Sequence, residues 1–286
     1  MTLVVAGFDY DGSVVFCADS LITGKNNGLS VKLVSSFRKI VPVELVINIP
    51  IIDRDGKILR YQQTLSEHRC MVAFAGSTLI SRHIMNNIEG HLKQIKYTYN
   101  NDDYILIMGC EDNSSVENNC WDESMYNIGD DNLYDLISKN FLVNLFTHCI
   151  KDSIKDFITQ SSSEFNEAWF RSDFIIAFSC NAPKRNYLYT FKMNFDDSGV
   201  SLIVNEIDKS ELAIIGISRY NTEIIDSITI QRSSPDFYLK SHLLNEVRKA
   251  VIDNEEVNLL EIGFPIATKT FDMHREITSQ FEYFKK

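Results

Sequence analysis

The chain has 286 residues and a formal net charge of −11, with 44% hydrophobic and 23% charged residues. This apolar share is too high for a disordered chain, and the length allows one large domain or two small ones. Six cysteines do not make a disulfide scaffold in a chain that can bury a sizeable core. No uncharged stretch reaches the ~20 residues of a membrane span. We therefore expect a soluble protein.

The acidic balance argues against a nucleic-acid partner, because 39 acidic residues against 28 basic ones would repel phosphate and the basic residues do not cluster. The first 20 residues carry three aspartates and no basic head, unlike a secretory signal. We expect a cytoplasmic protein with reduced thiols and no membrane partner. Between Lys96 and Lys139 the charged residues are all acidic. We interpret this segment as a solvated loop, since its Asp spacing matches no EF-hand.

The first predicted element is a β-hairpin. Apolar and β-branched residues 2–8 form one strand, residues 9–12 supply the turn, and residues 13–18 return to end at Asp19. Further strands are predicted at 39–49 and 69–75. A second turn lies at 52–57, so we interpret 43–70 as an inserted hairpin.

Helical periodicity begins after Gly76 and Ser77, and Ser77 or Thr78 is the candidate N-cap. The apolar residues then recur at steps of four and three and would line one helix face: Ile80, Ile84, Ile88, Leu92 and Ile95. A second helix is predicted at 132–158 and is apolar over a wide arc, as in a helix buried between layers. Residues 98–131 between the two helices are polar and show no period.

The rest of the chain reads as strands, two helices and a last strand. The strands are predicted at 173–179, 186–192, 200–205, 212–217 and 264–271, and the helices near 219–228 and 236–253. Helix pairs between runs of antiparallel strands predict an α+β fold, with two stacked sheets between helix layers in a four-layer αββα sandwich. We treat 1–286 as a single domain with insertions near 43–70 and 98–131.

Local motifs for metal or cofactor chemistry are missing. The cysteines form no CxxC pair, and the neighbours His68–Cys70 and His148–Cys149 lack zinc spacing. There is no GxSxG, HExxH, Walker or Gly-rich phosphate motif. We therefore expect no cofactor and no metal site.

The amino terminus is the most informative feature. Removal of Met1, which a small second residue permits, would leave Thr2 with a hydroxyl and a free amine close together. An α-amine has a pKa of roughly 7.7–8.0 and can act as a base near neutral pH. The hydroxyl is a weak nucleophile until such a base takes its proton. A nearby lysine would lower the pKa of the amine, and an aspartate would keep that lysine charged.

Several segments carry a family resemblance. Residues 2–5 (TLVV), Asp11-Gly12 and residues 14–20 (VVFCADS) are similar to the start of a proteasome β-type subunit. They are equally similar to the simpler bacterial relative that pairs with an ATPase unfoldase. Both are N-terminal-nucleophile hydrolases. Later landmarks also resemble this family, at residues 72–78 (VAFAGST), 213–216 (AIIG) and 263–266 (GFPI). The family fold is the αββα sandwich.

The resemblance implies a role for each matching residue. Thr2 would be the nucleophile and its amine the base, and Asp19 would orient the active-site lysine. Lys39 is the expected lysine because it opens the next strand, with Lys32 as its rival. The backbone N–H of Gly76 would form the oxyanion hole.

The matching positions also show departures. The family places a serine directly after the glycine matched by Gly216, whereas this chain has Ile217 there and Ser218 one step later. We take Ser218 as the counterpart. An aspartate and a serine of the family are replaced by Leu259 and Ile262.

The expected function is a threonine-type hydrolase that cleaves peptide bonds in a peptide or unfolded-protein substrate. The resemblance implies a homo-oligomer, a ring or a dimer, and makes an ATPase a candidate partner. A small amide is an alternative substrate. The main rival is a catalytically inactive subunit of the same fold that acts as a scaffold or binding module, which Ile217, Leu259 and Ile262 favour. A hydrolase using Cys17 is a third reading. If residues 98–131 cover Thr2, they would gate substrate access.

Overall fold

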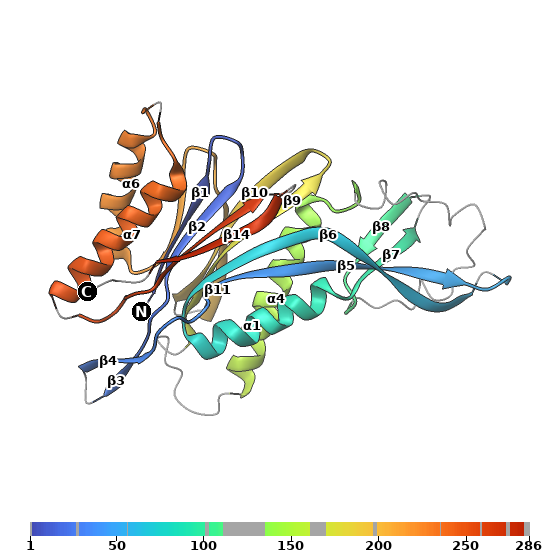
Figure 1. Ribbon diagram of the computed structural model, residues 1–286. Helices are drawn as coiled ribbons and strands as arrows, with labels where there is room; N and C mark the ends of the chain where they lie inside the picture. Colours follow the sequence, from blue (N-terminus) through green and yellow to red (C-terminus); the bar gives the residue numbers. More distant parts are fainter. Residues whose placement is uncertain are drawn as a thin grey trace.

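The computed structural model describes residues 2–26, 29–55, 57–100, 103–110, 135–160, 170–196, 199–234, 236–257, 259–272 and 275–282 (Figure 1). These residues form an α+β fold with several β-sheets and with helices packed outside them, as the order of predicted elements indicated. None of the described helices is both long and apolar enough to span a membrane.

A five-stranded antiparallel sheet contains the start of the chain. Its order is β12 (Leu212–Gly216), β1 (Leu3–Phe8), β2 (Val14–Asp19), β13 (Ile266–Asp272) and β14 (Arg275–Glu282). β1 and β2 are the predicted hairpin, and every residue of both strands is buried. Burial on both faces explains why these strands are almost continuously apolar instead of alternating.

A seven-stranded sheet faces the first one. Its order is β11 (Gly199–Glu206), β10 (Lys184–Asp196), β9 (Ser172–Asn181), β6 (Ile58–Gly76), β5 (Ile40–Ile52), β7 (Ile95–Asn100) and β8 (Asp103–Ile107). β5 and β6 pair along their length around the turn predicted at 52–57, and their far end extends away from the helices in Figure 1. β3 (Ile22–Asn26) and β4 (Leu29–Val34) make a separate two-stranded sheet.

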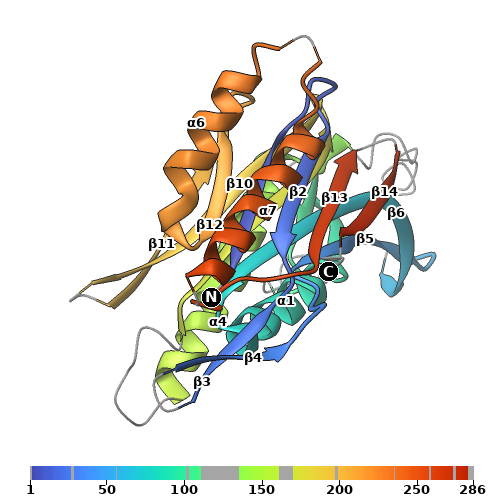
Figure 2. The same cartoon turned by 60° about the vertical axis from the view of Figure 1, so that its left-hand side comes forward.

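The helices form two pairs. α1 (Thr78–Leu92) and α4 (Lys139–Gln160) pack on the seven-stranded sheet, and α6 (Asn221–Gln231) and α7 (Leu239–Glu256) pack on the five-stranded sheet. Figures 1 and 2 show the pairs in separate parts of the molecule. A short 3₁₀ helix, η2 (Ser218–Tyr220), leads into α6.

Alternate residues of β1 enter different cores, as the period of a strand requires. Leu3 and Val5 pack with α6 and α7, whereas Val4 and Ala6 belong to a cluster shared by the two sheets. A third cluster joins α1 and α4 to the seven-stranded sheet, where Phe146 of α4 is fully buried. The start of the chain is thus held from both sides, with Thr2 at its end.

Some predicted bounds were wrong. The second helix begins at Lys139 rather than near 132, because Ser138 caps it: its Oγ accepts a hydrogen bond from the backbone N–H of Phe141 at 3.1 Å. Ile95, expected on the first helix, lies in β7. Residues 111–134, which hold most of the acidic segment and its expected gate, lie outside the described residues.

Candidate functional site

Thr2 lies at the start of β1 and is only 6% exposed. Its carbonyl oxygen accepts a hydrogen bond from the N–H of Ile217 at 2.9 Å. Gly216 has φ +97°, and a Cβ on it would lie 1.8 Å from that carbonyl oxygen. Only glycine lets the two strands approach this closely, so the backbone of Thr2 is held in one position. Met1, whose removal we expect, lies outside the described residues.

Lys39 and Asp19 form a buried ion pair next to the first residue of β1. Lys39 is 4% exposed and Asp19 is 0% exposed. The Nζ of Lys39 donates to both carboxylate oxygens of Asp19 at 2.9 Å and to the carbonyl oxygen of Leu21 at 2.8 Å. Each of the three ammonium protons therefore has an acceptor. The pair is fully hydrogen-bonded, as a buried charge requires.

Asp19 connects this lysine to the residue that follows Thr2. Its Oδ1 accepts a hydrogen bond from the backbone N–H of Leu3 at 2.9 Å. Its Oδ2 accepts from the N–H of Leu21 at 3.1 Å and of Gly263 at 3.4 Å. These bonds hold β1, β2 and the segment before β13 around one carboxylate. Asp19 thus links Lys39 to the backbone beside Thr2.

The electrostatics of the pair are set by burial. Loss of water lowers the pKa of Lys39, and the neighbouring carboxylate of Asp19 opposes this by charge and hydrogen bonding. The rival Lys32 lies elsewhere: its Nζ is 3.1 Å from Glu255 Oε1, and its side chain is 49% exposed. Lys39, and not Lys32, is therefore the lysine beside Asp19.

A pocket of about 1300 Å³ opens at Thr2. Its lining includes Gly76, Ser77, Gly216 and Ser218. Gly76 ends β6 with φ +115°, and a Cβ on it would lie 2.1 Å from the carbonyl oxygen of Arg171. No other residue type fits this backbone without strain. Ser218 begins η2. The pocket thus joins three of the predicted residues: Thr2, Gly76 and Ser218.

Further residues line the pocket that sequence reasoning missed. Arg171 directly precedes β9 and Asp173 is its second residue, and this end of β9 pairs with the end of β6. Burial raises the pKa of Asp173, while the charges of Arg171 and Lys192 act in the opposite sense. Leu79 of α1 also lines the pocket and is 77% exposed. These positions are distant from Thr2 along the chain, and only the sheet pairing places them beside it.

Two of the positions at which this chain departs from the family pattern, Ile217 and Ile262, pack in a core. Ile217 contacts Thr2 through its backbone, and its side chain is buried in the α6–α7 core together with Ile262. Leu259 is 36% exposed. Cys17, the alternative nucleophile, is fully buried in the same core and does not line the pocket at Thr2.

Comparisons with known proteins bear on the fold. No family model and no curated protein matches the chain. The structure is similar to a Gly-1 mutant of Anbu from Hyphomicrobium sp. strain MC1, with a TM-score of 0.52 and 13% identity over 98% of this chain and 87% of that one. A second similar structure is Anbu, described as an ancestral beta-subunit, from Yersinia bercovieri, with a TM-score of 0.49 and 12% identity over 95% and 82% of the two chains.

These findings correct the family predicted from the sequence. The similar structure with a TM-score above 0.5 is an Anbu protein, not a proteasome β-type subunit or its bacterial relative that pairs with an ATPase, and no family model supports that assignment. The motifs that suggested it are a strand start, a hairpin and glycines with positive φ. Such features follow from the shape of a fold and do not identify one family within it. The similarity to the Anbu mutant therefore concerns the fold alone.

Proposed function

We propose that the protein is a threonine-dependent amide hydrolase that acts on peptides. The observation that supports this most strongly is the buried Lys39–Asp19 pair, which is hydrogen-bonded to the backbone of Leu3, the neighbour of the pocket-lining Thr2. A buried ion pair adds little net stability compared with apolar residues of similar size. An electrostatic role at Thr2 explains its presence better.

The proposed mechanism begins with loss of Met1. The ammonium of Lys39, held charged by Asp19, lowers the pKa of the freed amine of Thr2, so that the amine is neutral near pH 7. This amine takes the proton of the Thr2 hydroxyl, and the oxygen attacks the substrate carbonyl. The N–H of Gly76 stabilises the oxyanion.

The intermediate is an ester on Thr2. As it forms, the amide C–N bond breaks and the protonated amine gives its proton to the leaving nitrogen. A water molecule, deprotonated by the same amine, then hydrolyses the ester and restores the hydroxyl. No group outside the chain is needed for this sequence. Ser218, at the pocket wall, would hydrogen-bond the terminal amine or the water.

The architecture proposed for this function is a single domain, 1–286, with four layers in the order αββα. Its support is that the two sheets share one buried cluster while each packs its other face on a helix pair. The segments 43–70 and 98–131 would be insertions in this plan. Leu79, Ile80 and Phe170 at the pocket wall favour a peptide with an apolar side chain near the cleaved bond.

The proposal is tested by hydrolysis of fluorogenic peptide amides with an apolar residue before the reporter. Thr2→Ala should lower kcat/KM by at least about 1000-fold, because it removes the nucleophile. Thr2→Ser should retain part of the activity, since it keeps a hydroxyl beside the amine. Thr222→Ala, at an exposed position of α6, is the matched control and should match the wild type. Equal activity of Thr2→Ala and wild type would overturn the proposal.

A further inference from the structure

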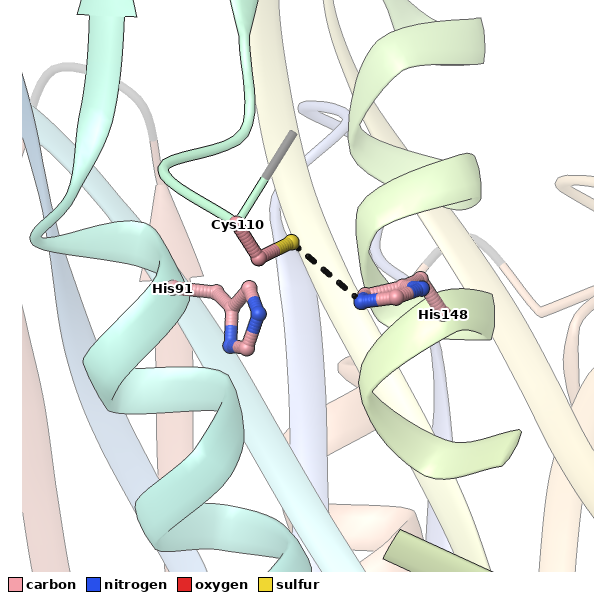
Figure 3. Close-up of side chains that lie close together, drawn as sticks. All are labelled: His91, Cys110 and His148. Carbon is pink, nitrogen blue, oxygen red and sulfur yellow. Dashed lines mark hydrogen bonds between the residues drawn. The ribbon is translucent and has the colours of Figure 1, made fainter. Parts of the chain in front are cut away.

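Three side chains that commonly bind metals meet between α1, α4 and the end of β8. His91 lies in the last turn of α1, Cys110 follows β8, and His148 belongs to α4 (Figure 3). One potential ligand atom from each residue lies within 4.8 Å of the other two. The Sγ of Cys110 and the Nε2 of His148 are 3.4 Å apart.

These separations suit a tetrahedral centre. With Zn–S of ≈ 2.3 Å and Zn–N of ≈ 2.0–2.1 Å, a sulfur and a nitrogen ligand lie about 3.5 Å apart. The Cys110–His148 distance already has this value. The other separations, at most 4.8 Å, would shorten by up to about 1.4 Å. Small rotations of exposed and half-buried side chains can supply this change.

The orientation of His91 is also that of a metal ligand. Its Nδ1 is 3.0 Å from the backbone carbonyl oxygen of Asn87. A carbonyl can only accept, so Nδ1 carries the proton and the lone pair is on Nε2. Metal-binding histidines usually have this outer hydrogen bond, which fixes the ring.

The surrounding helix contact is well defined. The side-chain amide of Asn87 donates to the carbonyl oxygen of Cys149 at 3.1 Å and to Ser153 Oγ at 2.9 Å. These bonds join α1 to α4 within one or two turns of His91 and His148. Two of the three ligands are therefore held on packed helices, while Cys110 lies at the exposed edge where an ion and water have access.

We propose that His91, Cys110 and His148 bind one zinc ion, with water as the fourth ligand. One thiolate and two imidazoles favour Zn²⁺ over Mg²⁺ or Ca²⁺, which prefer oxygen ligands. Local spacing could not show this site, because its residues come from three segments and none forms a short motif with another. The expectation of no metal site rested on local spacing alone.

The zinc site would be separate from Thr2. His83 contacts Phe157 and His91 contacts His148, so α1 and α4 run antiparallel. Ile80 and Phe157 line the Thr2 pocket at one end of this helix pair. His91 is eleven residues further along α1, or about 16 Å. The ion would therefore join α1, α4 and the end of β8 without entering the chemistry at Thr2.

The test uses the full chain, freed of metal with a chelator and titrated with Co²⁺. We expect one equivalent to bind, with the near-ultraviolet thiolate-to-cobalt band and the strong visible bands of a tetrahedral site. Zn²⁺ should displace the cobalt and raise Tm. Cys110→Ser should lose the thiolate band, and His91→Gln and His148→Gln should weaken Zn²⁺ binding by more than about tenfold.

His83→Gln is the matched control, because His83 lies on the same helix pair away from the cluster. It should bind Co²⁺ as the wild type does. Cys110 is exposed, so Cys110→Ser and Cys110→Ala should both fold, which circular dichroism would check. The proposal is overturned if wild type binds no Co²⁺, or if Cys110→Ser keeps the wild-type spectrum. Activity at Thr2 should be equal with and without zinc, so failure of one proposal is distinguishable from failure of the other.

Discussion

At the scale of single residues, the proposed chemistry depends on the buried charge of Lys39. Its ammonium is nearly excluded from water, and its three hydrogen bonds go to Asp19 and Leu21. Removing one member of such a pair costs about 3–5 kcal/mol, because the other charge stays buried without its partner. The remaining N–H donors to Asp19, from Leu3, Leu21 and Gly263, would reduce this cost for a lysine variant.

The state of Lys39 predicts how activity depends on pH. Burial lowers the pKa of Lys39 from its ordinary 10.5, so its ammonium loses the proton at a lower pH than an exposed lysine. The rate should rise with pH as the Thr2 amine becomes neutral and then fall, below pH 10.5, as Lys39 is neutralised. A pH profile of kcat/KM for peptide hydrolysis would measure both limbs.

Lys39→Arg provides the control for this profile, because a guanidinium stays charged across this range. The alkaline fall should move to higher pH in any folded fraction of this variant. An alkaline limb at the same pH in wild type and Lys39→Arg would assign the fall to another group.

The sequence indicated candidate site residues, but the spacing along the chain did not decide between the two lysines. Asp19 ends a strand and Lys39 precedes one, so adjacent positions could be inferred from the order of strands. Lys32 stayed a rival candidate because the spacing along the chain does not show which residues of neighbouring strands lie side by side. In the structure β3 and β4 form their own sheet, and Lys32 pairs with Glu255 of α7.

At the element scale, the contact of β12 with β1 positions Thr2, the proposed nucleophile. Gly216→Ala should destabilise the protein by at least about 1–2 kcal/mol, because alanine is strained at positive φ. Its Cβ would also meet the carbonyl oxygen of Thr2 at 1.8 Å. Urea unfolding would measure the loss of stability, and peptide hydrolysis should fall with it because Thr2 is displaced.

Gly90 is the matched control for that variant. It lies within α1, and a Cβ there would meet nothing within 4 Å. Gly90→Ala should therefore stabilise the protein by roughly 0.5–1 kcal/mol, since alanine loses less backbone freedom in a helix. An equal effect of the two substitutions would refute the view that close strand contact fixes Thr2.

Elements with strong local patterns could be predicted, and those that depend on distant partners could not. The apolar hairpin of β1 and β2 and the periodic face of α1 were evident in the sequence. β14 was missed because its strand character depends on pairing with β13 at the sheet edge. Arg171 and Asp173 were missed at the pocket because they reach it only through the pairing of β9 with β6.

At the scale of the whole molecule, the two sheets hold the site from both sides. Val4 and Phe16 of the five-stranded sheet share a buried cluster with Met71 and Ile175 of the seven-stranded sheet. Gly76 lies on the second sheet and Thr2 at the end of the first, so the pocket exists only where the sheets meet. The order of elements predicted an α+β fold, but the family could not be assigned from motifs that belong to the fold.

The expected homo-oligomer stays a prediction at this scale. α6 exposes Ile225 by 43% and Ile230 by 75%, which is apolar surface available for a second copy. Sedimentation velocity should give a mass that is a multiple of 32.8 kDa. Ile230→Glu should reduce this mass toward that of one chain, and Tyr238→Glu, at another exposed apolar position, is the control. A single-chain mass at all concentrations would contradict the prediction.

The role of Thr2 is tested most directly by the mass of the amino-terminal peptide after treatment with a β-lactone probe. We expect this peptide to begin at Thr2, without Met1, and to carry one probe molecule as an ester on the Thr2 hydroxyl. Thr2→Ala should carry none. A folded protein that retains Met1, or one whose free Thr2 stays unlabelled, would contradict the claim that Thr2 is the nucleophile.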